Sequence, residues 1–282
     1  MRLTNAARSF NHDTVTDGYT GEVLFKAQFA SFDGAAMGGA FERRRTVSTP
    51  PDSQPAARRV VSVQNVRWVM AELQLDSYMD RPIRQSCSAK IVTGLYTLLS
   101  PAQAALRDPT GVRTIYGSAE YAKHTTDTQT SSDYDSFYSV TFGSTESIPD
   151  GYFLRSNDQY FHIRNVQIMP EKLVELACDQ IALDTSSVKN CEVTALLSGA
   201  FDPITETQGA GISATGILMD MYRLFKYQTE SVDKGESGDM SLILSNTENL
   251  SAGQLVTING ETWRIIDFSP YLDAWNVHIR RA

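Results

Sequence analysis

The sequence predicts a mainly β protein with two small antiparallel β-barrel or sandwich domains, long loops and at most one or two short helices. Three observations lead to this prediction. Short runs of alternating apolar and polar residues recur along the chain, turn-forming residues separate these runs, and a hairpin pattern that starts at residue 150 occurs again from residue 252.

The N-terminal half contains several alternating runs. Alternation within 21–32 predicts a strand, and 40–48 is expected to be its partner. Alternation over 58–78 favours one long or bulged strand, with a helix over 66–75 as the competing interpretation. The segment 86–100 fits either a strand or a helix.

One short helix is expected at 100–108, where Ser100 suits the N-cap and Pro101 the first helical position. The segment 124–151 is rich in Thr, Ser and Asp and has no Lys or Arg. It therefore predicts a long exposed loop or arm, which one strand, "SFYSVTF", interrupts. A second, proline-rich loop is expected at 48–57.

The C-terminal third predicts a strand within 214–231, for which a helix is the alternative, and another strand over 238–246. A hairpin over 253–268 and a last strand near the C-terminus follow. The hairpin signal is an Asn-Gly pair between two alternating runs. The expected structural residues of this hairpin are Gly253, Asn259, Gly260 and Trp263.

A shift of 102 residues places 150–170 on 252–272. Gly151 then aligns with Gly253, and the apolar positions match on both arms of the hairpin. An internal duplication explains this match, and a likeness between two ordinary hairpins is the alternative. Under the duplication we expect an N-terminal arm at 1–17, a first domain at 18–182, a linker at 183–192 and a second domain at 193–282.

The composition is globular and acidic. The 282 residues carry a net charge of −8, with a pI near 5.1, which disfavours broad binding to nucleic acid or to an anionic membrane. The three cysteines include no C-x-x-C pair, so we expect reduced thiols. No segment predicts a signal peptide or a membrane span, so we expect assembly in the cytoplasm.

The sequence lacks the common catalytic and metal-binding patterns. "GAGISA" at 209–214 does not follow an apolar strand, the four histidines have no ligand-pair spacing, and no G-x-S-x-G occurs. Asp127, Asp133 and Asp135 lack the glycine and the terminal glutamate of a calcium loop. We therefore predict no catalytic residue, no metal and no cofactor, and we expect the chain not to be an enzyme.

Basic residues flank the proline-rich loop. If 40–48 and 58–66 pair across this loop, five guanidinium groups gather on one hairpin. Such a hairpin is either a solvated surface or a docking arm for an acidic protein partner or for DNA phosphate. The five residues are Arg43, Arg44, Arg45, Arg58 and Arg59.

Residues 214–282 carry a more specific pattern. A strand with G-I-L and a strand "SLILSN" precede a hairpin of the form G-x-x-V-x-I-x-G and a closing strand. This pattern resembles that of tailed-bacteriophage head–tail joining proteins, which are head-completion or stopper-like proteins. The hairpin positions are occupied by Gly253, Val256, Ile258, Gly260 and Ile265, while Gln254 stands where an acidic residue is usual and Trp263 where tyrosine is usual.

The resemblance implies a β-barrel protein of the virion neck, whose copies form a ring, often sixfold, between the portal or adaptor and the tail. An acidic channel would let double-stranded DNA pass without sequence-specific binding. The acidic charge and the lack of a long apolar run lead us to expect no membrane partner. The polar loop is then a candidate channel plug or inter-subunit arm, with candidate residues Thr125, Thr126, Asp127, Asp133, Tyr134 and Asp135.

Two other functions fit the sequence. The chain could be a different tail component, such as a tail terminator, an adaptor or a baseplate protein. It could also be a carbohydrate-binding or hydrolytic β-protein with Asp133, Asp135, Trp263 and Trp275 as sugar contacts. A core position is favoured for Trp263, because it belongs to an alternating strand.

Overall fold

The computed structural model describes most of the chain. The described residues are 13–31, 44–54, 59–108, 110, 113–123, 136–143, 148–157, 159–170, 172–182, 191–199, 201–202, 207–220, 238–245 and 249–282. The chain divides into two compact units. The first contains 1–95, 115–148 and 166–176, and the second contains 96–114, 149–165 and 177–282.

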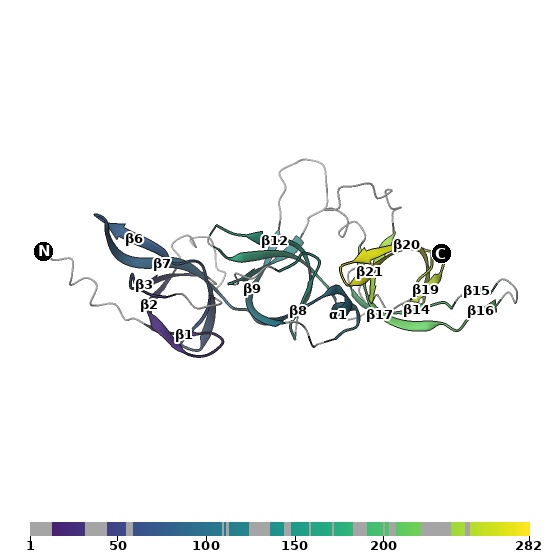
Figure 1. The fold of residues 1–282 in the computed structure, drawn as a ribbon, viewed down its shortest axis with the longest axis horizontal. Coiled ribbons are helices and arrows are strands. Elements are labelled where there is room, and N and C mark those ends of the chain that lie inside the picture. Colours follow the sequence, from purple (N-terminus) through teal and green to yellow (C-terminus); the bar gives the residue numbers. More distant parts are fainter. Residues whose placement is uncertain are drawn as a thin grey trace. The chain divides into compact units, whose positions relative to one another are not determined.

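The first of three closed barrels occupies the N-terminal third of the chain (Figure 1). Its strands follow the order β3-β2-β1-β4-β5-β7, and β3 pairs with β7 to close the barrel. The next strand, β6 (Gln74–Tyr78), pairs with β7 alone. The six barrel strands are β1 (Asp13–Asp17), β2 (Val23–Ser31), β3 (Arg44–Thr49), β4 (Val60–Val63), β5 (Val66–Met70) and β7 (Arg81–Ile91).

The second barrel follows directly and contributes strands to both compact units. Around this barrel the order is β10-β13-β12-β11-β8-β9. Its strands are β8 (Gly94–Leu99), β9 (Arg113–Lys123), β10 (Ser136–Phe142), β11 (Phe153–Arg155), β12 (Tyr160–Ile168) and β13 (Val174–Gln180).

The helix α1 (Pro101–Ala105) lies between β8 and β9 and confirms the short helix expected there. Its N-terminus carries a capping box. The hydroxyl of Ser100 accepts from the backbone N–H of Gln103 at 3.3 Å, and the Gln103 side chain accepts from the N–H of Ser100 at 3.0 Å. These two bonds satisfy backbone donors that would otherwise lack partners.

The third barrel occupies the C-terminal third, in the order β14-β17-β18-β21-β20-β19. A separate two-stranded ribbon of β15 (Phe201–Asp202) and β16 (Thr207–Gln208) interrupts it after the first strand. The barrel strands are β14 (Cys191–Leu197), β17 (Ile212–Asp220), β18 (Met240–Ser245), β19 (Leu255–Ile258), β20 (Glu261–Tyr271) and β21 (Ala274–Arg281).

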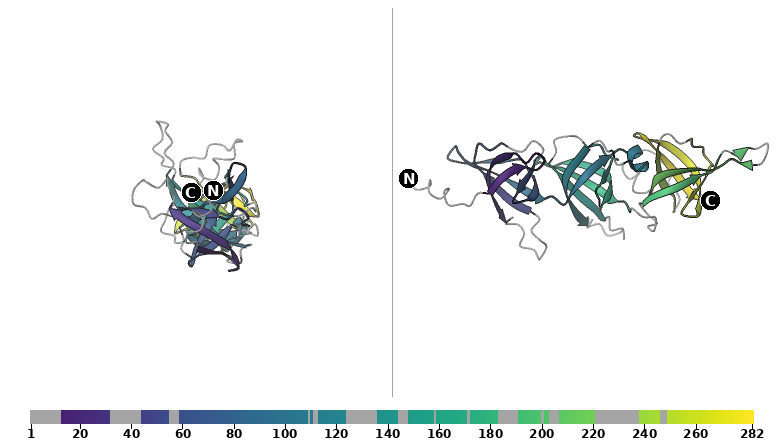
Figure 2. Two further views of the ribbon diagram at one scale, coloured as in Figure 1. Left: turned by 90° about the vertical axis from the view of Figure 1, so that its left-hand side faces the viewer. Right: turned by 90° about the horizontal axis from the view of Figure 1, so that it is seen from below.

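The three barrels repeat one topology. When the strands of each barrel are numbered one to six along the chain, leaving out β6, the cyclic order is 1-2-3-6-5-4 in every case. The right-hand view of Figure 2 shows how each sheet curves round to close on itself. The predicted duplication is therefore a repeat, and the structure shows three copies of it rather than two.

The register of the central hairpin is the same in all three barrels. Val60 pairs with Val69, Phe153 with His162 and Leu255 with Arg264. One backbone bond across each hairpin also recurs. It runs from Met70 to Arg59 at 2.7 Å, from Ile163 to Tyr152 at 2.8 Å and from Ile265 to Gln254 at 2.9 Å.

The expected domain at 18–182 thus differs from the structure, because it contains two closed barrels. The alternation over 58–78 is not one strand or a helix. It forms β4, β5 and β6, because Gln64 and Asn65 adopt φ values of 49° and 65° and turn the chain back. Part of the expected N-terminal arm, residues 13–17, is β1 of the first barrel, while 1–12 lie outside the described residues.

Several element predictions are confirmed. The pairing of 21–32 with 40–48 is the β2–β3 ladder, and "SFYSVTF" is β10. Within 86–100 the structure has the end of β7 and β8, so the strand interpretation is correct. Within 214–231, β17 is a strand as far as Asp220, and 221–231 lie outside the described residues.

Alternate side chains of the strands fill the barrels. In the third barrel the inward residues include Val193, Leu218, Leu242 and Trp263, which confirms the core position expected for Trp263. Its strand β18 is buried along its whole length. The outer face of β18 contributes Ile243 to a second apolar cluster with α1 and with strands of the second barrel. In the part of the chain that the structure describes, no helix is long and apolar enough to span a membrane.

Candidate interaction site

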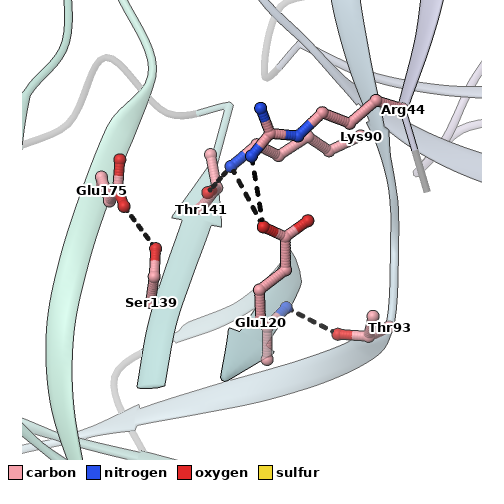
Figure 3. A network of polar contacts seen from close by, with 8 residues as sticks. Arg44, Lys90, Thr93, Glu120, Ser139, Thr141 and Glu175 are labelled. Atoms are coloured by element: carbon pink, nitrogen blue, oxygen red, sulfur yellow. Dashed lines mark hydrogen bonds and ion pairs between the residues drawn. The ribbon is translucent and has the colours of Figure 1, made fainter. Parts of the chain in front are cut away.

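A charged cluster in the first compact unit connects the first barrel to the second (Figure 3). Arg44 on β3 and Lys90 on β7 are direct cross-strand partners. Like charges in this arrangement destabilise a sheet unless a counter-charge lies between them. Glu120 on β9 supplies that charge. One of its carboxylate oxygens lies 3.4 Å from Nη2 of Arg44 and 3.9 Å from Nζ of Lys90.

Hydroxyl groups complete this cluster. Lys90 donates from Nζ to Oγ1 of Thr141 at 3.0 Å, and the backbone N–H of Ala119 donates to Oγ1 of Thr93 at 2.8 Å. Figure 3 also shows Ser139, whose hydroxyl donates to the carboxylate of Glu175 at 2.5 Å. Glu175 lies on β13, which pairs with the strand of Ser139. The cluster thus holds two cations against one carboxylate, with half of the Arg44 side chain (50%) exposed to solvent.

The predicted arginine hairpin is not formed, because β3 pairs with β2 and β7, whereas β4 pairs with β1 and β5. The two arginine-bearing segments are therefore not neighbours in the sheet. This pairing could not be read from the sequence, since the barrel closes between strands far apart in the chain. Arg43 and Arg58 lie outside the described residues.

Arg59 makes a separate set of contacts. Its guanidinium donates to the carbonyl of Lys172 at 3.1 Å and lies 4.0 Å from Glu72, which also pairs with the ammonium of Lys172 at 2.5 Å. Arg45 lies within β3 opposite Ala89 and is half-buried. Arg44 and Arg59 are therefore held by contacts of this chain, and the prediction that the arginines dock a partner or DNA stays a prediction.

The candidate channel residues, 125–127 and 133–135, lie outside the described residues. The hairpin residues lie where the sequence predicted them. Asn259 and Gly260 form the turn with φ values of 52° and 81°, and Gly253 has a φ of 85°. The guanidinium of Arg281 lies 5.5 Å from the centre of the buried Trp263 ring.

A second polar cluster, which sequence reasoning missed, holds the last strand of the chain. The buried carboxylate of Asp239 accepts two bonds from Arg280, each at 2.9 Å, and lies 2.8 Å from Nε2 of His278. The nearby hydroxyl of Ser241 is buried and donates to Asn276. The Ser241 hydroxyl bonds to the amide oxygen of Asn276, whereas His278 bonds to the carboxylate of Asp239. The hydroxyl and the imidazole are therefore not paired as nucleophile and base, and the cluster anchors β21.

Among the residues that the structure describes, no group of three or more His, Cys, Asp or Glu is placed to hold a metal ion. All three cysteines are buried. Comparison with known proteins finds no matching family model, no matching curated protein and no matching solved structure.

Proposed function

We propose that this chain is a structural protein of a tailed-phage particle, which forms a ring at the head–tail interface and joins the portal or adaptor to the tail. One observation carries the proposal. The strands of the third barrel fall where the pattern that resembles head–tail joining proteins places them. These strands are β17, β18, the β19–β20 hairpin and β21.

The glycine of the G-I-L pattern has a structural role in this barrel. A Cβ atom on Gly216 would lie 2.7 Å from the carbonyl oxygen of Ile243 and 2.8 Å from a methyl group of Leu244. Only glycine lets β17 approach β18 this closely. The pattern therefore describes a packing requirement of the barrel as well as a sequence likeness.

The architecture supports a role in assembly. Closed barrels leave their strands without free edges, which prevents uncontrolled pairing between copies that are crowded in a particle. Copies then meet through side chains and through added elements such as the β15–β16 ribbon. The net charge of −8 suits a surface along which DNA passes without binding.

The test is the position and assembly state of the full chain. We expect negatively stained images of the purified protein to show a ring with a central hole, or a monomer that forms a ring only on portal-bearing heads. A monomer that joins neither heads nor tails would contradict the proposal. A ring that binds at another position of the tail would instead indicate a tail terminator, an adaptor or a baseplate protein.

Charge reversal at Arg43, Arg45 and Arg58 tests whether the arginines take part in this docking. We expect the reversed variant to fold but to bind heads more weakly, with salt reducing the binding of the original chain as well. Unchanged binding would exclude these side chains from the contact.

A further inference from the structure

The first barrel carries a two-stranded ribbon between its fifth and sixth strands, β5 and β7 (Figure 1). The ribbon consists of β6, the turn at Met79-Asp80 and residues 81–84 of β7. The ladder from β7 to β3 begins only at Gln85, and β6 pairs with β7 alone. Within the described part of the chain, no third strand pairs with the ribbon. Two strands without further packing are only marginally stable in water.

The ribbon exposes three large apolar side chains. The exposed fractions are 54% for Leu75, 78% for Met79 and 57% for Ile83. The adjacent residues form a polar pair, in which Asp76 accepts from Nε of Arg84 at 2.8 Å. Since neighbouring residues of a strand point to opposite faces, Leu75 faces away from this ion pair. A group of exposed apolar side chains on a soluble protein commonly marks a contact site.

The turn of the ribbon presents an apolar side chain in an unusual backbone conformation. Met79 and Asp80 have φ values of 50° and 60°, in the left-handed region that favours glycine and asparagine. Two consecutive residues in this conformation form a two-residue hairpin turn, as Gln64 and Asn65 do, and the conformation is less favourable for methionine than for glycine or asparagine. The turn therefore places Met79 at the exposed tip of the ribbon, in a backbone conformation that is unfavourable for methionine.

The charge of the ribbon indicates what binds there. The charged residues of the ribbon are Asp76, Asp80, Arg81 and Arg84, which sum to zero, while the whole chain carries −8. A neutral apolar surface does not select a basic or an acidic partner. It is instead a surface through which two copies of an acidic chain can approach without repulsion.

We infer that the β6–β7 ribbon binds a second copy of this chain, with ribbon packed against ribbon through Leu75, Met79 and Ile83 of both copies. This contact is isologous, because the same surface is used on both sides, and it closes a pair. A ring needs a different, heterologous contact. The inference therefore does not depend on the proposed position at the head–tail interface.

Sedimentation equilibrium of the full chain over a series of concentrations tests the contact. We expect paired chains for the original protein and association about tenfold weaker or more for the double variant Leu75→Ser with Ile83→Ser. Ile168→Ser is the matched control, because Ile168 is 77% exposed but lies outside the ribbon. Met79→Gly removes the tip side chain and relaxes the turn, so it tests the same contact without risk to the fold.

Oxidative cross-linking provides a second measurement. Since the native cysteines are buried, Ile83→Cys introduces the accessible thiol. We expect covalent pairs from Ile83→Cys and none from the control Ile168→Cys. Single chains at every concentration, or pairing that the ribbon substitutions leave unchanged, would overturn the inference. Rings that persist while the ribbon substitutions abolish pairing would support both proposals, because a ring uses a different contact. Rings that persist together with unchanged pairing would overturn the ribbon contact and leave the proposed function standing.

Discussion

The hydroxyl oxygen of Tyr271 lies 3.0 Å from Nε2 of His162. Tyr271 ends β20 of the third barrel and His162 belongs to β12 of the second, and both belong to the second compact unit. The same hydroxyl lies against Gly151, where a Cβ atom would come within 2.5 Å of it. The contact between these strands therefore requires glycine at position 151 as well as the tyrosine.

Gly151→Ala should destabilise the protein more than Gly253→Ala. The two glycines are equivalent in the repeat, and their φ values of 81° and 85° impose a similar backbone cost on alanine, about 1 kcal/mol. No atom lies within 4 Å of a Cβ at Gly253, whereas alanine at 151 displaces Tyr271. We expect a further loss of about 1–3 kcal/mol for Gly151→Ala.

Urea unfolding of both variants measures this difference. The second variant Tyr271→Phe removes the clashing oxygen, so it should restore part of the loss when it is combined with Gly151→Ala. Equal losses at the two glycines would show that Tyr271 relaxes without cost.

The stability of the second unit should depend on the neutral form of His162. Burial, together with the nearby guanidinium of Arg164, lowers the pKa of His162 from 6.5 to about 3. Between these values the unfolded chain binds a proton that the folded chain excludes. Stability is therefore fully present above pH 6.5 and falls as the pH drops towards 3, by up to about 1.4 kcal/mol per pH unit.

His162→Gln tests this dependence, because glutamine does not titrate and can still bond to Tyr271. We expect the free energy of unfolding of the variant to change less between pH 6.5 and pH 4 than that of the original chain. Tyr271→Phe keeps the histidine and should keep the full pH dependence. A His162→Gln variant with an unchanged pH slope would contradict the burial of neutral histidine.

Glu120→Gln should cause a small loss of stability that depends on salt. The substitution leaves Arg44 and Lys90 as unneutralised cross-strand partners, but the Glu120 side chain is 24% exposed and solvent screens the pair. We expect a loss of about 0.5–1 kcal/mol at low salt and less at high salt. Asp76→Asn is the control, since its arginine partner faces no second cation in the sheet. A loss that salt does not change would argue against the charge effect.

Glu192→Gln should cost more than Glu120→Gln. Only 7% of the Glu192 side chain is exposed, and its two carboxylate oxygens lie 3.8 Å from Arg107 and 3.8 Å from Arg155. Removing the shared charge leaves two partly desolvated guanidinium groups without this counter-charge, which costs about 2 kcal/mol. Urea unfolding at low and high salt measures the loss, and we expect salt to change it little because the site is buried. A smaller loss than that of Glu120→Gln would contradict this order.

Local signals in the sequence predicted most of the strands. The Asn259-Gly260 pair, the Ser100-Pro101 cap and the alternation in β2 and β10 each act within a few residues of the chain. The β4–β5 turn was missed because it lacks such a local signal. Gln64 and Asn65 adopt the left-handed conformation without the glycine that marks such turns in a sequence.

The sequence by itself thus determined the β class, the central hairpin of the last two barrels and the inward position of Trp263, because periodicity and turn chemistry are local properties. The tertiary structure alone decided that three barrels close, that the segments carrying Arg44 and Arg59 are not neighbours in the sheet, and that β18 is buried on both faces. These features depend on ladders such as β3–β7 and β1–β4, which join residues more than 35 positions apart. No short stretch of sequence specifies such a pairing, since it follows from how the whole sheet closes.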